Sequence, residues 1–249
     1  MKTGNKLSQS QRLLSELGLK NECSEVGNME RFVGQHKNTL RYVPENRRWV
    51  EWNGSRWLLC DESQVFDRAL QTAKVIYDEA RDCVTEEGKK RLTHWALQSQ
   101  KHQKIMSMIS MSAKHPEMVT HLRDFDTNPL VLNCLNGTVD LKTGELSSPS
   151  SSFLVMKQVS YAFKRHAKCP IFTNFLHEIF NGDRELIRWL QRAIGYTVTG
   201  QTSEQAIFIG YGTGANGKST LFETILDILG DYGRAAEFDT FLSKESNTR

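Results

Sequence analysis

The chain has 249 residues, of which 39% are hydrophobic and 24% charged, a globular composition that excludes a largely disordered protein. No apolar run is long enough to span a bilayer, and the polar N-terminus has no apolar core, which excludes a secretory signal. The formal net charge of +3 divides into +6 over residues 1–169 and −3 over residues 170–249. The basic first part suits a nucleic-acid partner, but on charge alone an ordinary solvated surface is the favoured explanation of so small an excess.

The first part of the chain predicts an α+β module with a leader in front of it. Residues 1–28 are expected to form a flexible leader with at most one short helix. Residues 29–60 are rich in aromatic and β-branched side chains and are interrupted by turn signals at Pro44-Glu45-Asn46 and Asn53-Gly54. This pattern predicts a small β-meander.

Residues 62–113 contain no proline and show helical periodicity. We expect Glu86-Glu87-Gly88 to divide this stretch into two helices, of which the second runs from about Lys89 to Ala113. In the first helix, residues at spacings of three and four positions form one predicted face. They are Val65, Ala69, Thr72, Ala73 and Ile76.

Strand character returns in residues 130–147. There Asn136-Gly137 predicts a tight hairpin and Lys142-Thr143-Gly144 a second turn. The segment SSPSSS at residues 147–152 has the composition of a linker or a surface loop, and a strand-like run follows it directly.

The predicted amino-terminal module spans residues 29–165, and a second domain is predicted over residues 166–249. In the second domain we expect, in chain order, two amphipathic helices, a buried strand and a third helix. These elements are expected at residues 171–180, at residues 184–194 between the N-cap Asp183 and Gly195, at residues 204–211, and at residues 217–229 before Gly230.

The most specific functional signal is the segment GTGANGKS from Gly212 to Ser219, which matches the phosphate-loop pattern GxxxxGK[ST] at every fixed position. Glycines let the backbone adopt left-handed angles and bring its N–H groups close to phosphate oxygens, while the helix N-terminus attracts an anion. Lys218 is expected to reach the β- and γ-phosphates, and the Ser219 hydroxyl to ligate Mg²⁺. The predicted nucleotide-binding residues are Gly212, Thr213, Gly214, Ala215, Asn216, Gly217, Lys218, Ser219 and Thr220. The alternative is a glycine-rich turn that merely joins a strand to a helix.

Hydrolysis of a bound nucleotide needs further residues, including an acidic side chain at the end of a second apolar strand. The 30 residues after Ser219 contain no such strand, so no catalytic residue is predicted. A parallel sheet also needs another strand and its crossover. We therefore expect the start of an α/β P-loop domain, truncated after the P-loop helix.

Three segments resemble phage and plasmid primase–helicases of the poxvirus-type superfamily 3 group. Residues 175–233, FLHEIFNGDRELIRWLQRAIGYTVTGQTSEQAIFIGYGTGANGKSTLFETILDILGDYG, resemble the start of the helicase core. FDTNPLVLNCLNGTVDLKTGEL at residues 125–146 resembles the segment before that core, and RYVPENRRWVEWNGSRW at residues 41–57 resembles the opening of the amino-terminal module. The similarity covers roughly residues 30–242.

This resemblance implies an AAA+-like core that binds ATP and Mg²⁺ and drives 3′-to-5′ DNA unwinding as a hexameric ring at replication origins. It implies ATP contacts from Gly212 to Thr220, chiefly through Lys218 and Ser219, and single-stranded or origin DNA as the partner. It also implies a phage or prophage origin and the cytoplasm of a bacterial host. The Walker B acids, sensor asparagine, arginine finger and DNA-contacting hairpin of the family have no counterpart in this sequence.

Other candidate groups have competing structural explanations. Trp49, Trp52 and Trp57 alternate with Arg47, Arg48 and Arg56 and could stack on bases, but aromatic side chains in a small meander more often form its core. The run Lys164-Arg165-His166-Ala167-Lys168 could contact DNA or be an exposed basic linker. Asp124 and Asp126 form a D-x-D pattern typical of primase carboxylates, although turn and cap roles are favoured.

The remaining metal-binding residue types show no metal-site spacing. His94, His102, His115 and His121 are expected to be surface or capping residues. The cysteines, odd in number and far apart, favour a reducing cytosolic setting over a disulfide framework, and they are Cys23, Cys60, Cys83, Cys134 and Cys169.

These observations favour the ATP-binding portion of a phage- or plasmid-type DNA replication helicase. The alternative is a non-enzymatic DNA- or partner-binding module whose P-loop is vestigial. A small-molecule kinase is disfavoured, because such enzymes usually place the P-loop near the N-terminus and the acceptor site downstream of it.

Overall fold

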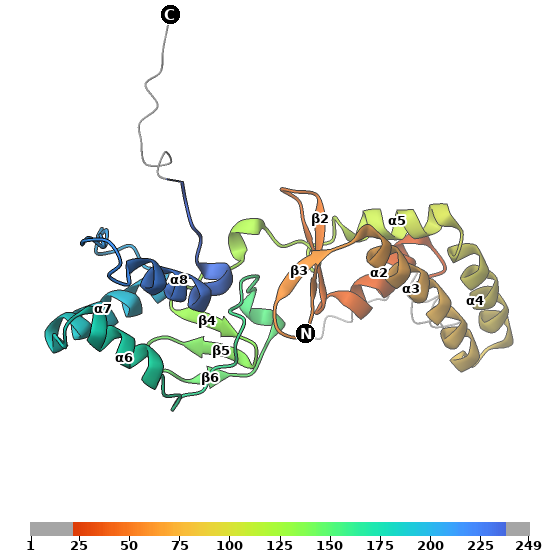
Figure 1. The fold of residues 1–249 in the computed structure, drawn as a ribbon. Helices are drawn as coiled ribbons and strands as arrows, with labels where there is room; N and C mark the ends of the chain where they lie inside the picture. Colours follow the sequence, from red (N-terminus) through yellow and green to blue (C-terminus); the bar gives the residue numbers. More distant parts are fainter. Residues whose placement is uncertain (1–21, 238–249) are drawn as a thin grey trace, which may run out of the picture. The chain divides into compact units, whose positions relative to one another are not determined.

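The computed structural model describes residues 22–237, so most of the predicted leader lies outside the described residues (Figure 1). The chain divides into two units. The first contains the residues up to Asn53 together with Trp57–Phe125, and the second contains Gly54–Arg56 and the residues from Asp126 onward. The predicted module boundary near residues 164–170 lies within the second unit and stays a prediction.

The first unit is α+β, with one antiparallel sheet in the order β1-β2-β3. Residues Tyr42 and Trp49 are paired in this sheet, and Trp49 is also paired with Cys60. Its elements are α2 (Glu25–His36), β1 (Leu40–Val43), β2 (Arg48–Trp52), β3 (Trp57–Cys60), α3 (Glu62–Asp82), α4 (Glu86–Ser99), α5 (His102–Ser112) and the short 3₁₀ helix η1 (Leu122–Asp124).

The predicted meander is confirmed from β1 onward, but helix α2 occupies the residues before it. Ser24 accounts for this helix, because its hydroxyl accepts a hydrogen bond from the Gly27 N–H at 3.0 Å and so caps the first turn. Residues 29–36, which were predicted to begin the meander, are therefore helical.

Residues 62–113 form three helices, not two. Glu86-Glu87-Gly88, predicted to be a break, is the first turn of α4, because the Thr85 hydroxyl accepts the Gly88 N–H at 3.1 Å. The second break falls at Lys101, whose extended backbone carries no proline or glycine signal. The predicted buried face of α3 is confirmed at every position, since Val65, Ala69, Thr72, Ala73 and Ile76 are all buried.

The core of this unit lies between the sheet and helices α2, α3 and α5, and it includes Phe32, Trp49 and Met108. Trp49 and Trp57 are 6% and 0% exposed, which confirms the core role predicted for these tryptophans. The Arg41 guanidinium lies 5.5 Å from the centre of the Trp57 ring, so a basic residue of this sheet stacks on a buried tryptophan.

An ion pair is buried where α2 meets α3. The Arg31 guanidinium donates to the Glu79 carboxylate through Nε at 2.8 Å and through Nη2 at 2.7 Å, and the Arg31 side chain is 1% exposed. Arg31 Nη1 also donates to the Glu22 carbonyl at 2.9 Å. These bonds satisfy a charge that would otherwise be costly to bury.

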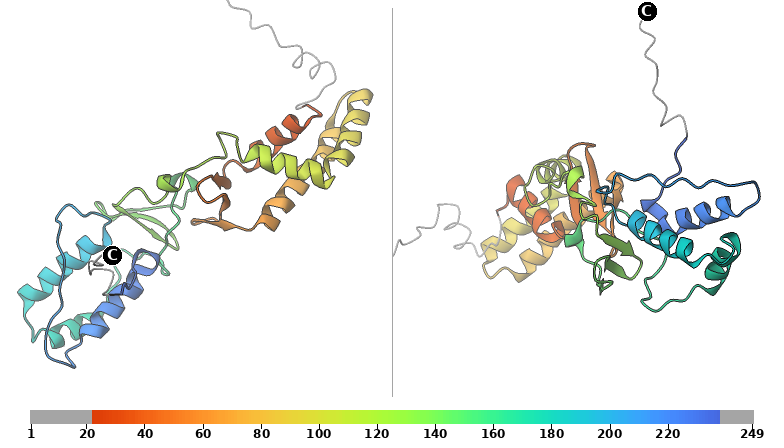
Figure 2. Two further views of the ribbon diagram at one scale, coloured as in Figure 1. Left: turned by 90° about the horizontal axis from the view of Figure 1, so that it is seen from above. Right: turned by 90° about the vertical axis from the view of Figure 1, so that its left-hand side faces the viewer.

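The second unit combines a small antiparallel sheet, in the order β4-β5-β6, with three longer helices (Figure 2). Its elements are β4 (Val131–Cys134), β5 (Gly137–Asp140), β6 (Leu146–Ser147), η2 (Ser151–Phe153), α6 (Pro170–Ile179), α7 (Arg184–Val198), α8 (Lys218–Leu229) and η3 (Gly230–Tyr232). The α+β class predicted for the amino-terminal module is thus confirmed, whereas the α/β P-loop fold predicted for residues 166–249 stays a prediction.

The predicted hairpin exists, shifted by one residue. Cys134 pairs with Gly137, so the two-residue loop is Leu135-Asn136, and Gly137 already belongs to β5. Gly137 has φ +143, and a Cβ there would overlap the Ser147 carbonyl of β6. The predicted turn between β5 and β6 is confirmed, with Asp140 Oδ1 accepting the Lys142 N–H at 2.7 Å.

Tyr232 connects the end of α8 to this sheet. Its hydroxyl accepts the Asn133 N–H at 3.1 Å and donates to the Lys157 carbonyl at 3.2 Å. Burial raises the pKa of Tyr232 to about 12, so the donor proton stays in place at neutral pH. This contact anchors the C-terminal end of α8.

The helices of the second unit follow the sequence closely, whereas the predicted strand does not form. Asp183 caps α7 as predicted, although α7 continues past Gly195 to Val198. Residues 204–211 form no strand, since Glu204 lies in a turn and Gln205 has φ +46, and Ile207 and Ile209 are 84% and 79% exposed. A strand needs a neighbour for its backbone hydrogen bonds, and no strand among the described residues pairs with this segment. No helix in the described part of the chain is long and apolar enough to cross a membrane.

Glu79→Gln is expected to lower the free energy of unfolding by about 3 kcal/mol, because it leaves the buried Arg31 charge without its carboxylate. Urea denaturation measures the change. Glu117→Gln is the matched control, since it breaks the exposed pair with Lys37 and should have no measurable effect. Equal effects of the two substitutions would contradict the assignment of Arg31 as a buried charge.

The stability of the protein should fall as the pH drops from 6.5 to 4 because of His36. Burial, assisted by the nearby Arg68 charge, lowers the pKa of His36 from 6.5 to about 4. Between pH 6.5 and 4 the unfolded chain therefore takes up a proton at His36 while the folded protein does not. The contribution of His36 to the free energy of unfolding is thus fully present above pH 6.5 and is lost as the pH falls toward 4. His36→Gln should flatten the curve of unfolding free energy against pH, and an unchanged slope would show that His36 is not the group responsible.

Candidate functional site

The predicted phosphate loop lies directly before the first turn of α8. Gly212, Ala215 and Gly217 have φ values of +152, +57 and +80, so three positions of the turn adopt the left-handed conformations expected of such a loop. Gly217 is the N-cap residue of α8, and Lys218 is the first residue of that helix. The structure therefore brings residues 212–220 together in front of a helix N-terminus.

Close packing also requires the glycines around this loop. A Cβ on Gly217 would lie 2.6 Å from Ile179 Cγ2 of α6, and a Cβ on Gly210 would lie 2.7 Å from the ring of Phe222 of α8. Both distances are shorter than side-chain atoms tolerate. Helix α6 and the extended segment before the loop thus lie against the start of α8 and limit where the loop can go.

The Lys218 ammonium folds back over the loop. Its Nζ donates to the main-chain carbonyls of Gly212 at 3.1 Å and Thr213 at 3.3 Å, and to the Asn216 Oδ1 at 2.7 Å. An ammonium has three donors, so these acceptors can use all of them. The Asn216 contact was not foreseen, because the sequence pattern treats that position as a variable residue that offers only its backbone.

The remaining predicted residues lie on the open side of the loop. Thr213 and Gly214 are exposed at its tip, while Ser219 and Thr220 are exposed in the first turn of α8. At this end of a helix the backbone N–H groups have no partners within the helix, and the helix dipole favours an anion. The site therefore offers one cation, backbone donors and three exposed hydroxyl groups, those of Thr213, Ser219 and Thr220.

The donor set suits a magnesium ion only in part. Ser219 carries an exposed hydroxyl where the predicted ligand should be. Among residues 22–237, however, no group of three or more histidine, cysteine or acidic side chains is arranged to hold a metal ion. Mg²⁺ prefers oxygen ligands and commonly keeps several waters and phosphate oxygens, so an ion at Ser219 would depend on the phosphates of a nucleotide.

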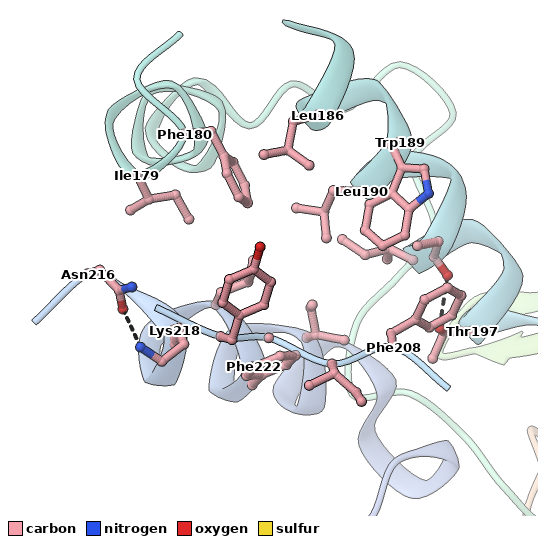
Figure 3. A pocket seen from close by; sticks show the side chains of 17 residues that line it. Ile179, Phe180, Leu186, Trp189, Leu190, Thr197, Phe208, Asn216, Lys218 and Phe222 are labelled. Carbon is pink, nitrogen blue, oxygen red and sulfur yellow. Dashed lines mark hydrogen bonds between the residues drawn. The ribbon is translucent and has the colours of Figure 1, made fainter. Parts of the chain in front are cut away.

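A pocket of about 910 Å³ adjoins the loop (Figure 3). Its walls are mainly apolar and come from the end of α6, from α7, from the extended segment before the loop and from α8, with Trp189, Leu190 and Phe222 among them. Figure 3 shows Asn216 and Lys218 at the end of the pocket near Ile179, away from Trp189. The apolar periodicity of α7 indicates in the sequence that one face of this helix is covered. It does not indicate that this face lines a pocket.

The other candidate residues lie outside this site. The Asp124 carboxylate accepts the His121 N–H at 3.0 Å, which confirms its cap role, whereas the Asp126 carboxylate accepts the N–H of the distant Met156 at 3.0 Å and so holds two segments of the chain together. His115 Nδ1 accepts the Glu117 N–H at 3.2 Å, a capping contact of the predicted kind.

The basic run and the thiols are also separate from the loop. Residues 164–168 are exposed throughout. All five cysteines are free thiols, and burial raises the pKa of Cys60 to about 11, so this thiol stays protonated at neutral pH.

Comparison with known proteins supports the resemblance noted from the sequence. Residues 29–181 match the model of a family described as D5 N terminal like. A curated relative, a protein named "Putative helicase L207/L206" from Acanthamoeba polyphaga mimivirus, is 24% identical over 223 residues. That match covers 85% of this chain but 23% of the relative, so the chain spans about a quarter of the length of the protein it matches. Because the family model covers more than half of the residues, the chain belongs to the D5 N terminal like family of phage and viral primase–helicases.

Proposed function

We propose that this chain binds ATP through residues 212–220 and is the ATP-binding portion of a phage- or plasmid-type DNA replication helicase. The observation that carries the proposal is the position of the Lys218 ammonium, over a left-handed glycine turn at the start of α8. A cation, a helix N-terminus and a concave backbone turn attract the same ligand, a chain of phosphates.

The pocket beside the loop supports a nucleotide over a free phosphate ion. Small-molecule sites have volumes on the order of 300–1,000 Å³, and a pocket of about 910 Å³ falls in that range. Lys218 lies at one end of this pocket. If the phosphates of a nucleotide bound there, its uncharged nucleoside would contact the apolar walls of the pocket. Mg²⁺ would then be shared between the phosphate oxygens and the Ser219 hydroxyl.

ATP-driven unwinding is proposed for the intact protein to which this portion corresponds. The family and the viral relative named a putative helicase support this step. Hydrolysis also needs acidic and arginine side chains around the γ-phosphate, and ring assembly of such subunits commonly supplies the arginine in trans. Self-association into a ring and a setting in the host cytoplasm are part of the same proposal.

DNA is the proposed macromolecular partner, and the stretch from Leu146 to His177 is the proposed contact. This stretch contains no acidic residue, while it carries Lys157, Lys164, Arg165 and Lys168. Residues 164–168 are exposed, so their charges can approach a phosphate backbone without a change in the fold.

Lys218→Ala is expected to reduce the affinity for ATP with Mg²⁺ at least a hundredfold, because the substitution removes the cation that faces the phosphates. Isothermal titration calorimetry with soluble, folded protein measures the affinity. Lys142→Ala is the control, since that lysine is exposed and lies in the β5–β6 turn. Equal ATP binding by the two variants would overturn the proposal and favour a module with a vestigial P-loop.

The combined change of Lys164, Arg165 and Lys168 to alanine should weaken binding to single-stranded DNA. A plot of the logarithm of the association constant against the logarithm of the salt concentration has a negative slope. The loss of three phosphate contacts should reduce the magnitude of that slope by about 2. Fluorescence anisotropy at several salt concentrations measures both quantities. An unchanged slope would place the DNA contact elsewhere.

A further inference from the structure

We infer that the side chain of Asn216 is a gate on the nucleotide site, one that holds Lys218 against the loop and must release it when a phosphate binds. This inference rests on the proposed function, because it concerns how the same loop exchanges its own contacts for a ligand. Asn216 thereby acquires a role distinct from the backbone role that the sequence pattern assigns to its position.

The contact between Asn216 and Lys218 is the shortest of the three that Lys218 makes in the loop. The Asn216 Oδ1 accepts from the ammonium at 2.7 Å, compared with 3.1 Å for the Gly212 carbonyl and 3.3 Å for the Thr213 carbonyl (Figure 3). With three acceptors for three donors, the ammonium is satisfied without any ligand. An incoming phosphate therefore has to displace at least one of these oxygens.

The position of the carboxamide is set by Gly212. A Cβ at Gly212 would overlap the Asn216 Nδ2, and it would lie 3.8 Å from Lys218 Nζ. The amide thus crosses the loop against the bare Gly212 backbone, beside the ammonium. The glycine gives the amide the space that it needs, in addition to its backbone freedom at φ +152.

Asn216 is the acceptor that can leave. The carbonyls of Gly212 and Thr213 belong to the main chain, so their removal would require the loop itself to change conformation. The Asn216 oxygen can leave by rotation about side-chain bonds, while the turn and the start of α8 stay in place. After that rotation, Lys218 keeps its backbone contact at Gly212 and turns the freed N–H toward a phosphate oxygen.

The first test measures the contact without any nucleotide. Partial acylation of the folded protein, followed by mass spectrometry, gives the reactivity of the Lys218 amine relative to the exposed Lys142 in the same sample. Asn216→Ala should increase this ratio severalfold, because one acceptor of the ammonium is gone. An unchanged ratio would overturn the inference, whether or not the protein binds nucleotide.

The second test measures the exchange with inorganic tripolyphosphate and with ATP and Mg²⁺ as probes. Asn216→Ala should bind both about fivefold more tightly than the wild type, because the competing acceptor is removed. Asn216→Asp should bind both more weakly, since it places a negative charge beside the ammonium. Lys142→Ala is the control, because this exposed residue of the β5–β6 turn lies outside residues 212–220, and its affinity should not change.

The outcomes separate this inference from the proposed function. A wild-type protein that binds neither probe would overturn the proposed function. A wild-type protein that binds them, together with an Asn216→Ala variant of equal or lower affinity, would overturn the gate alone. Circular dichroism melting curves of the variants should match that of the wild type, since the asparagine side chain is half-buried in a loop.

Discussion

The Lys218 ammonium lies over the turn formed by residues 212–217, and this cation determines the chemistry of the second unit. Without it, the turn would be an exposed glycine-rich connection with left-handed backbone angles and no preference for charge. With it, the turn combines a mobile positive charge with the N-terminus of α8, so both favour an anion at the same place. The contacts of Lys218 with loop oxygens show how that charge is accommodated when no anion is present.

The position of the cation depends in turn on the anchoring of α8 at both ends. At its start, Gly217 lies against Ile179 of α6 so closely that no other residue fits. Beyond its end, Tyr232 bonds to the backbone of Asn133 in β4, and the Asp231 carboxylate pairs with Arg56 and accepts the Gln158 N–H. The small sheet therefore has a function beyond its own stability, because it fixes the helix that carries Lys218.

Local signals in the sequence predicted several features that neighbouring residues decide, but not all of them. The Asp183 cap, the α3 face around Ala69 and the turn at Gly217 were predicted because each depends on residues within a few positions. The hairpin at Asn136 is displaced by one residue, because Gly137 pairs with Cys134 of β4 and so belongs to β5. Glu86-Glu87-Gly88 was wrongly interpreted as a helix break, because Thr85 caps the helix that these residues begin.

Features that depend on distant partners could not be predicted. Nothing in the residues near Arg31 shows that Glu79 will satisfy its charge, and nothing near Asn216 shows that its amide will face Lys218. The strand predicted at residues 204–211 does not form, for the same reason. Its composition suits a buried strand, but composition does not supply the neighbouring strand that its backbone needs.

This difference between local and distant requirements separates nucleotide binding from hydrolysis in physical terms. The phosphate loop depends on backbone angles within a few residues and on the start of one helix, and these are in place although residues 204–211 form no strand. Hydrolysis depends on acidic and arginine groups that other strands and subunits bring to the γ-phosphate. The proposed nucleotide binding therefore requires only this loop and Lys218, whereas the proposed hydrolysis requires side chains that other strands and subunits bring to the γ-phosphate.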